Sequence, residues 1–206
     1  MIYDISPPLT PATPVWPGDS RFTHEWSCKL ATGDSVNLST LTTTPHIGAH
    51  ADPPLHSEEG RSGIGELPLA PFLGRCRVIE VSAPDLIKPR HLEGRDLTGE
   101  VRVLFKTGSV RGRGTFPPRF TAIAEDTITL LAGLGVQLVG IDTPSVDPFI
   151  SKTLDVHHAL NRHGMVNLEG LDLDRVPPGE YELIALPLRF MGLDASPVRA
   201  ILRTLH

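Results

Sequence analysis

Three histidines and one aspartate lie within eleven residues, in the segment Pro45-His-Ile-Gly-Ala-His-Ala-Asp-Pro-Pro-Leu-His56. The whole chain has nine histidines, so this segment is a strong local concentration. Imidazole nitrogen and carboxylate oxygen are ligand types that zinc and similar divalent metals prefer. The segment therefore predicts a metal site built around His46, His50 and Asp52.

The spacing of these residues constrains the backbone between them. His46 and His50 are separated by one turn of a helix, which would put both side chains on one side. Pro53 disfavours helical backbone at Asp52, and a bend there would turn the carboxylate toward the same metal. A fully extended chain would spread residues 46–56 over about 30 Å. The segment must therefore curl if all its polar side chains act together.

A second pair of candidate ligands lies later in the chain. His157 falls on a predicted helix, 154–163, and Glu169 directly follows a predicted strand. One helix residue and one strand residue from adjacent elements can converge on a common point. His158 and His163 compete for the role of His157, and Glu169 has the alternative of being a plain exposed carboxylate. Spacing alone leaves this pair open.

One of the two tryptophans, Trp16, lies in the turn sequence Val15-Trp-Pro-Gly-Asp19. A loop aromatic can cover an aromatic substrate. A tryptophan packed on the core beneath a turn is the other interpretation, and the residues alone favour it.

The elements that must position these residues are short. The chain has 206 residues, 40% of them hydrophobic and 21% charged, and its 20 prolines and 19 glycines are spread without forming a linker. This indicates one domain, 1–206, of α/β class with short mixed strands and few helices. Predicted strands are 1–5, 22–30, 35–42, 77–82, 101–106, 136–142, 166–168, 182–186 and 198–205, and predicted helices are 121–135 and 154–163.

Several function classes are disfavoured. The formal net charge is −5, which offers no basic field for nucleic acid, and the compact basic stretch 111–113 is expected to be a solvated loop. No apolar run approaches the ~18–20 residues that span a bilayer, and the first residues do not form a signal peptide, so a cytoplasmic protein is expected. The cysteines, Cys28 and Cys76, form no paired motif and are expected to be free thiols. No glycine-rich phosphate loop and no Gly-x-Ser-x-Gly elbow is present.

The motif His46-x-Gly-x-His50-x-Asp52-x-Pro-x-His56 resembles the signature of the cyclase-like metal-dependent hydrolases. Within that family the chain looks like the bacterial kynurenine formamidases, also called arylformamidases. One departure is Ala49, where the family often has threonine. The likeness extends over nearly the whole chain, through Trp16-Pro-Gly-Asp19, Gly140-Ile-Asp-Thr-Pro-Ser145, Ser151-Lys-Thr-Leu-Asp-Val-His157, Leu168-Glu-Gly-Leu171, Leu186-Pro-Leu188 and Ser196-Pro-Val-Arg199.

The resemblance implies a metal centre with two zinc ions per subunit. His46, His50 and Asp52 would bind the first zinc, and Asp52 would bridge to a second zinc held by His157 and Glu169. The same ligand types also accept manganese and cobalt. The resemblance further implies a homodimer and a swivelling β/β/α fold.

The resemblance also implies a reaction, the hydrolysis of N-formyl-L-kynurenine to L-kynurenine and formate in tryptophan degradation. His56 would be the catalytic acid and base. Trp16 would contact this aromatic formamide substrate, whereas the residues alone favour a tryptophan packed on the core.

Two other readings remain. The first is an amidase or lactonase that acts on another ring-opened or cyclic substrate. The metal motif does not define the pocket, so it does not distinguish between these substrates. Alternatively the chain binds or senses a metal without turnover, which would require only the ligands and not His56.

Overall fold

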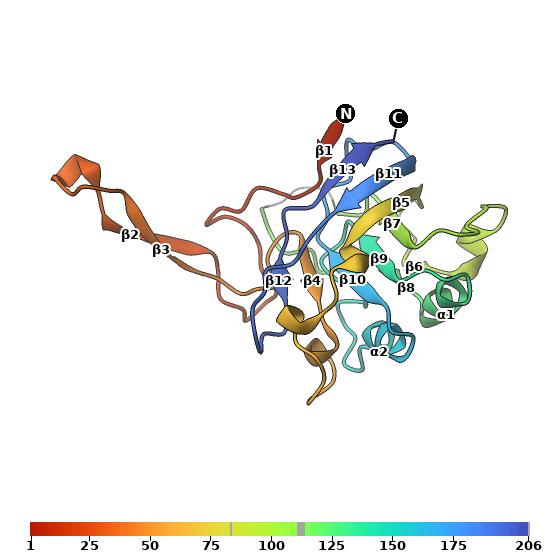
Figure 1. The fold of residues 1–206 in the computed structure, drawn as a ribbon. Coiled ribbons are helices and arrows are strands. Elements are labelled where there is room, and N and C mark those ends of the chain that lie inside the picture. The colour runs from red at the N-terminus through yellow and green to blue at the C-terminus, as the bar shows by residue number, and fades with distance from the viewer. Residues whose placement is uncertain (83, 111–113, 206) are drawn as a thin grey trace.

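A computed structural model describes residues 1–82, 84–110 and 114–205; the basic segment 111–113, for which we expect a solvated loop, lies outside them. A large sheet is formed by β1 (Ile2–Asp4), β4 (His50–Asp52), β5 (Leu73–Glu80), β7 (Arg102–Lys106), β9 (Leu138–Ile141), β10 (Val166–Glu169), β11 (Gly179–Ile184), β12 (Ser196–Pro197) and β13 (Ile201–Thr204). Among the described residues it has nine strands, in the order β1-β13-β11-β5-β7-β9-β10-β4-β12 (Figure 1). The sheet is mixed: its middle strands, β5, β7, β9 and β10, are parallel, and the outer pairs are antiparallel.

The two α-helices cover one face of the parallel strands. They are α1 (Glu125–Gly133) and α2 (Asp155–Arg162). Parallel strands need long crossover connections. The connection from β7 to β9 contains α1, and that from β9 to β10 contains α2. Because side chains alternate along a strand, Val103 and Phe105 of β7 pack with the helices, while Leu104 packs into the core on the other face. Among the described residues, no helix has the length and apolar character that crossing a bilayer requires.

The predicted α/β class with few helices is confirmed, and most predicted elements overlap observed ones. The predicted helix 121–135 is wrong at its start, because residues 122–123 form the short strand β8. This strand pairs with residues 86–87, and the helix begins only at Glu125. The small sheet consists of β6 (Leu86–Ile87) and β8 (Ala122–Ile123).

A two-stranded hairpin projects from the body of the molecule, and we call it the arm (Figure 1). It consists of β2 (Thr23–Cys28) and β3 (Leu38–Thr42), which pair antiparallel. His24 pairs with Leu41, so that His24, Trp26 and Leu41 lie on one face of the hairpin. The other face carries polar residues along most of its length, and Ser27 and Thr40 share a hydrogen bond there, although Leu38 lies at its end. The arm is thus amphipathic, although Trp26 and Leu41 remain 49% and 57% exposed.

Candidate metal centre

The cluster of candidate ligands lies where a parallel strand ends. Glu169 is the last residue of β10, and His157 lies in the first turn of α2. His50 and Asp52 belong to β4, which runs antiparallel beside β10. The register of this pair places His50 opposite Glu169 and Asp52 opposite Asn167. Strand pairing therefore brings residues more than a hundred positions apart into one cluster.

Four buried side chains form the centre. Asp52 lies between two histidines: its Oδ1 is 3.5 Å from His50 Nε2, and its Oδ2 is 3.5 Å from His157 Nε2. Glu169 faces the same two nitrogens, with Oε2 3.4 Å from His50 Nε2 and Oε1 3.5 Å from His157 Nε2. Both carboxylates thus face both imidazoles.

Several ligand atoms of this cluster make no hydrogen bond, although they lie near groups of opposite charge. Of four buried side-chain polar atoms without a hydrogen bond in the described chain, three are His50 Nε2, Asp52 Oδ1 and His157 Nε2. A buried polar atom left unpaired costs about 1–3 kcal/mol, so three neighbouring ones call for a ligand. Their nitrogen and oxygen chemistry fits a divalent cation such as zinc.

The second nitrogen of each buried histidine is held by the protein. His50 Nδ1 donates to the carbonyl oxygen of Gly48 at 3.0 Å, and His157 Nδ1 donates to Asp147 Oδ2 at 2.7 Å. An imidazole that donates from Nδ1 presents the lone pair of Nε2. Asp147 also accepts the backbone N–H groups of Val156 and His157 at 3.1 Å, which fixes the start of α2.

The carboxylates are held in a similar way. Asn167 Nδ2 donates to Asp52 Oδ2 at 2.8 Å and to Glu169 Oε1 at 3.1 Å. The backbone N–H of Val146 donates to the same Glu169 oxygen at 2.8 Å. Side chains on which a metal site depends are commonly oriented by such outer contacts.

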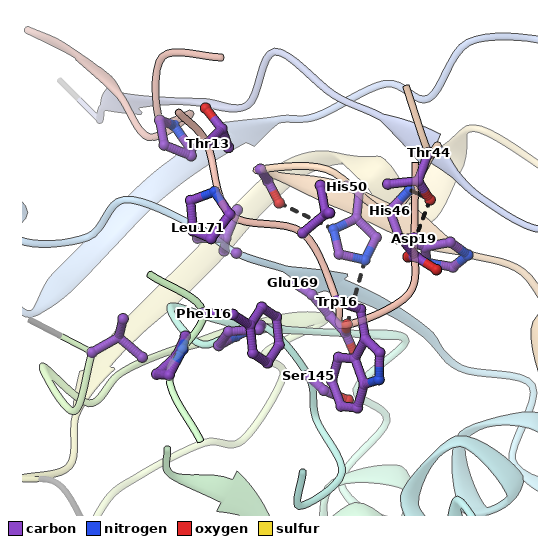
Figure 2. A pocket seen from close by; sticks show the side chains of 18 of the residues that line it. Thr13, Trp16, Asp19, Thr44, His46, His50, Phe116, Ser145, Glu169 and Leu171 are labelled. Carbon is purple, nitrogen blue, oxygen red and sulfur yellow. Dashed lines mark hydrogen bonds and ion pairs between the residues drawn. The ribbon is translucent and has the colours of Figure 1, made fainter. Parts of the chain in front are cut away.

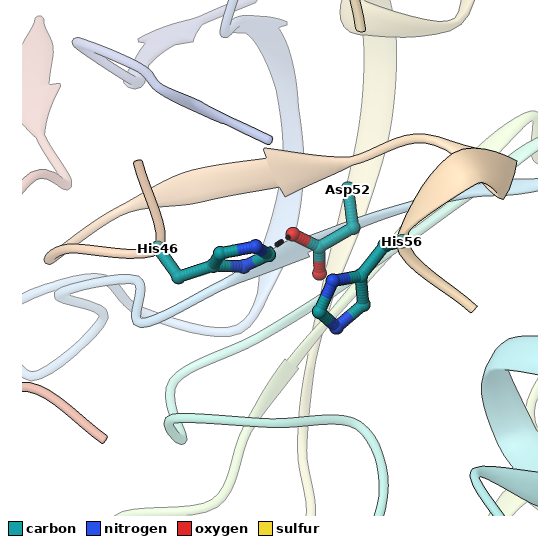
Figure 3. A group of neighbouring side chains, drawn as sticks. All are labelled: His46, Asp52 and His56. Carbon is teal, nitrogen blue, oxygen red and sulfur yellow. Dashed lines mark ion pairs between the residues drawn. The ribbon is translucent and has the colours of Figure 1, made fainter. Parts of the chain in front are cut away.

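A second group, His46, Asp52 and His56, shares Asp52 with the first (Figure 3). His46 Nδ1 lies 3.1 Å from Asp52 Oδ1, and the His56 ring centroid is 4.3 Å from that of His46. The ligand atoms of His46, Asp52 and His56 all lie within 4.8 Å of one another, a spacing compatible with a metal. Asp194 Oδ2 is 3.1 Å from His46 Nε2 and 3.8 Å from His56 Nδ1.

The predicted curl of the 46–56 segment is confirmed, but the helical turn between His46 and His50 is wrong. His50 and Asp52 lie on a strand, and the 3₁₀ turn η2 (Pro54–His56) brings His56 back. Gly48, at φ +60°, bends the chain between the two histidines.

Electrostatics keep both central carboxylates ionised. Burial raises the pKa of Glu169 and the charge of Asp52 raises it further, but contacts with His157 and His50 outweigh both and hold it at about 2. Burial also opposes ionisation of Asp52, yet the nearby histidines keep its pKa well below the usual value. The ionised carboxylates of Asp52 and Glu169 are thus two adjacent buried negative charges, which nearby positive charge must balance.

The histidines supply that charge when no metal is bound. Burial lowers the pKa of His50 and of His157, but the neighbouring carboxylates outweigh it and raise both. Burial likewise opposes protonation of His46, but Asp52 and Asp194 raise its pKa to about 9. His56 differs, because burial lowers its pKa and the opposing charges around it do not compensate. A bound cation would replace the protons on the other histidines.

A cavity of about 570 Å³ adjoins the cluster. Trp16 and Phe116 lie next to one another in its wall (Figure 2), with ring centroids 5.1 Å apart. Phe149 packs on Trp16 from behind the lining, also at 5.1 Å. The ligand candidates that line the cavity are His46, His50, His56, His157 and Glu169.

The structure brings together all the residues that the sequence nominates for metal binding and proton transfer, and it places Trp16 in the same cavity. The competing histidines lie elsewhere: His158 Nδ1 is 3.3 Å from Glu58 Oε1, and His163 is exposed at the end of α2. Glu169 is buried, which excludes a plain exposed carboxylate. The nominated residues are His46, His50, Asp52, His56, His157 and Glu169.

Sequence reasoning missed three polar residues that hold the ligands, Asp147, Asn167 and Asp194. A signal existed for Asp147, because it follows a predicted strand, where α/β sheets place functional side chains. The role of Asn167 depends on strand register, and that of Asp194 on a contact across 148 residues, so local patterns give neither.

A family model described as "Putative cyclase" matches residues 3–148. Among solved structures, the "predicted metal-dependent hydrolase from Bacillus stearothermophilus" is 29% identical, with a TM-score of 0.84 over 98% of this chain and 97% of that chain. A "potential metal-dependent hydrolase with cyclase activity" is also 29% identical, with a TM-score of 0.84 over 98% and 96% of the two chains. Isatin hydrolase A from Labrenzia aggregata shares the fold, with 23% identity and a TM-score of 0.83 over 98% and 93%. The family match covers more than half of the sequence, and the chain belongs to the cyclase family.

Proposed function

We propose that this chain is a metal-dependent hydrolase that converts N-formyl-L-kynurenine to L-kynurenine and formate. The observation that carries the proposal is the set of buried atoms of His50, Asp52 and His157 that make no hydrogen bond, beside an aromatic-walled cavity. Two similar proteins are described as metal-dependent hydrolases, which supports the reaction class. The formamide substrate rests on the resemblance of the motifs and on the aromatic wall.

Two overlapping ligand sets are available for the metal. His46, His50 and Asp52 would hold one zinc, and Asp52, His157 and Glu169 would hold the other. Asp52 belongs to both sets because its two oxygens face different histidines. When bound, zinc lowers the pKa of a coordinated water toward about 7 and polarises a carbonyl oxygen.

His56 is the residue that we assign to proton transfer. The amide nitrogen of a formyl anilide is a poor leaving group until it is protonated. Because burial lowers the pKa of His56, its imidazole is neutral at pH 7 and can act first as a base. It takes a proton from the water that attacks the formyl carbon. It then returns this proton to the amide nitrogen as the C–N bond breaks.

The aromatic wall gives the substrate its orientation. Trp16 is half-buried and packs edge-on against Phe116, which leaves ring surface on the cavity side. Offset or edge-on packing against such rings contributes about 0.5–1.5 kcal/mol beyond burial of area. An aryl ring held there presents its formamide group toward the histidines that line the same cavity.

The test is the initial rate of N-formyl-L-kynurenine hydrolysis before metal stripping, after it, and after zinc is returned. We expect the rate to vanish with the metal and to recover with zinc. Isatin, a cyclic amide, serves as the comparison substrate under the same conditions. Turnover of isatin without turnover of the formamide would replace the substrate assignment and keep the hydrolase. Zinc binding with no turnover of either compound would instead support a binding or sensing protein.

We also propose that the chain forms a homodimer. An isolated two-stranded hairpin is marginally stable in water, so the arm needs packing that its own body does not supply. Its exposed apolar face, with Trp26 and Leu41, offers a surface for a second copy. Two-fold symmetric pairing is the commonest way in which soluble chains cover such surfaces.

A further inference from the structure

Residues 188–194, which we call the strap, reach the metal centre from near the end of the chain. The strap lies against the 3₁₀ turn η3 (Ile64–Glu66) through two backbone hydrogen bonds. The N–H of Ile64 donates to the carbonyl oxygen of Leu193 at 3.0 Å, and the N–H of Gly65 donates to that of Phe190 at 3.0 Å. These bonds fix the backbone just before Asp194.

The close approach of the strap depends on glycine. A Cβ atom at Gly65 would lie 2.6 Å from the carbonyl oxygen of Phe190, and one at Gly63 would lie 3.0 Å from that of Leu193. The first distance is one that real Cβ atoms do not adopt, and the atom it meets is backbone. A side chain at Gly65 would therefore push the strap away from η3.

The strap places the carboxylate of Asp194 on one side of the His46 ring. Asp194 Oδ2 lies 3.1 Å from His46 Nε2, while His46 Nδ1 on the other side lies 3.1 Å from Asp52 Oδ1. The ring is thus fixed between two carboxylates, one in the buried centre and one half-exposed at the cavity. Asp194 also lies 3.8 Å from His56 Nδ1.

We propose that Asp194 is a positioning residue for the metal centre. It accepts a hydrogen bond from His46 Nε2 and so keeps the His46 Nδ1 lone pair directed toward the ion that Asp52 would share. Histidines that bind metals usually donate their other ring N–H to a carboxylate, carbonyl or water. The inference rests on the proposed metal site, but it assigns a role that the motif does not contain.

The first test compares two substitutions of Asp194 by zinc affinity, measured in competition with a chromophoric chelator. Asp194→Ala removes the acceptor and should weaken zinc binding by about 10- to 100-fold. Asp194→Asn keeps an acceptor oxygen and should retain most of the affinity. With zinc bound, nitrogen-15 NMR should find His46 as the Nε2–H tautomer in the wild type and in Asp194→Asn, and no single tautomer in Asp194→Ala.

Several results would overturn the proposal. Unchanged zinc affinity in Asp194→Ala would do so, and a raised KM with unchanged affinity would make Asp194 a substrate contact instead. Equal losses in Asp194→Asn and Asp194→Ala would show that charge, rather than orientation, matters. A wild-type chain that binds no zinc would refute the proposed function itself, so the two failures are distinguishable.

The second test moves the strap and leaves Asp194 in place. Gly65→Ala should weaken zinc binding in the same direction as Asp194→Ala, because it displaces Phe190. Gly133→Ala, on α1, is the matched control, since a Cβ there meets no atom within 4 Å. Circular dichroism and thermal melting check that both variants fold. Wild-type affinity in a folded Gly65→Ala would contradict the role of the strap.

Discussion

In each of the histidines His46, His50 and His157, one ring nitrogen faces the candidate metal centre and the other faces an acceptor oxygen of the protein. The acceptors differ in charge: His50 donates to a backbone carbonyl, whereas His46 and His157 face carboxylates. A carboxylate acceptor makes the imidazole a more basic ligand than a carbonyl does. His56 has no such partner within 3.5 Å among the described residues, which suits a group that must exchange its proton.

His56→Ala should lower turnover of N-formyl-L-kynurenine by about 10²- to 10⁴-fold, the usual contribution of an acid–base group. Zinc content should stay at the wild-type level, because the ligand set does not include His56. Metal analysis and kinetics on the same preparation check both parts. His158→Ala is the matched control, since His158 pairs with Glu58 at the surface. Loss of zinc from His56→Ala would make His56 a ligand, as its distance from His46 and Asp52 permits.

Zinc affinity should increase with pH up to about pH 9. Zinc binds the deprotonated imidazole, and in the metal-free chain the pKa of His46 is raised to about 9. Below that pH the proton must be displaced, so each displaced proton weakens apparent affinity by up to about tenfold per pH unit. Chelator competition at several pH values measures the slope, and calorimetry in buffers of different ionisation enthalpy counts the protons released. An affinity independent of pH between 7 and 9 would contradict the raised pKa.

At the scale of elements, the pairing of β4 with β10 is what assembles the ligands. Gly170 directly follows Glu169, the last residue of β10, and adopts φ +64°. A Cβ atom at this position would lie 2.1 Å from the carbonyl oxygen of Gly48. That same oxygen accepts the hydrogen bond of His50 Nδ1. The glycine therefore lets the end of β10 approach the loop that carries His46 and His50.

Gly170→Ala should separate this loop from β10 and weaken zinc binding as well as folding. Gly164→Ala is the matched control, because Gly164 has nearly the same φ, +65°, but open space around its Cβ position. The control should lose only the ~1–2 kcal/mol of a left-handed alanine from the free energy of unfolding. Urea unfolding and zinc titration of both variants separate backbone strain from the contact. Equal effects of the two substitutions on zinc binding would show that zinc binding does not depend on the close approach of Gly170 to Gly48.

The elements themselves could largely be predicted from sequence, because hydrophobic alternation and helical spacing are local. Residues 101–106 alternate, and Arg102–Lys106 form β7. The predicted second helix, 154–163, coincides with α2 to within a residue at each end. Local spacing could not distinguish a helical turn from a bent strand between His46 and His50. The hydrogen bond of Asn167 to Asp52 depends on register between strands 115 residues apart, which no local pattern encodes.

At the scale of the whole molecule, the centre depends on four distant parts of the chain. These parts are 46–56, 146–157, 167–170 and 194. They meet because the parallel middle of the sheet is extended at one edge by the antiparallel strands β4 and β12. The arm, by contrast, contributes no lining residue to the cavity in the described chain. Its length and its amphipathic faces therefore call for a different explanation.

Trp26→Glu should shift the chain from dimer to monomer, because it puts a charge on the apolar face that we assign to a second copy. The expected result is half the wild-type mass in light scattering coupled to size exclusion, with a transition that depends on protein concentration. Thr40→Glu is the matched control: Thr40 is also exposed on the arm, but it lies on the opposite face from Trp26, so the mass should not change. A wild-type monomer at all concentrations would refute the homodimer. Dimers of both variants would place the interface elsewhere and leave the arm free to cover another partner.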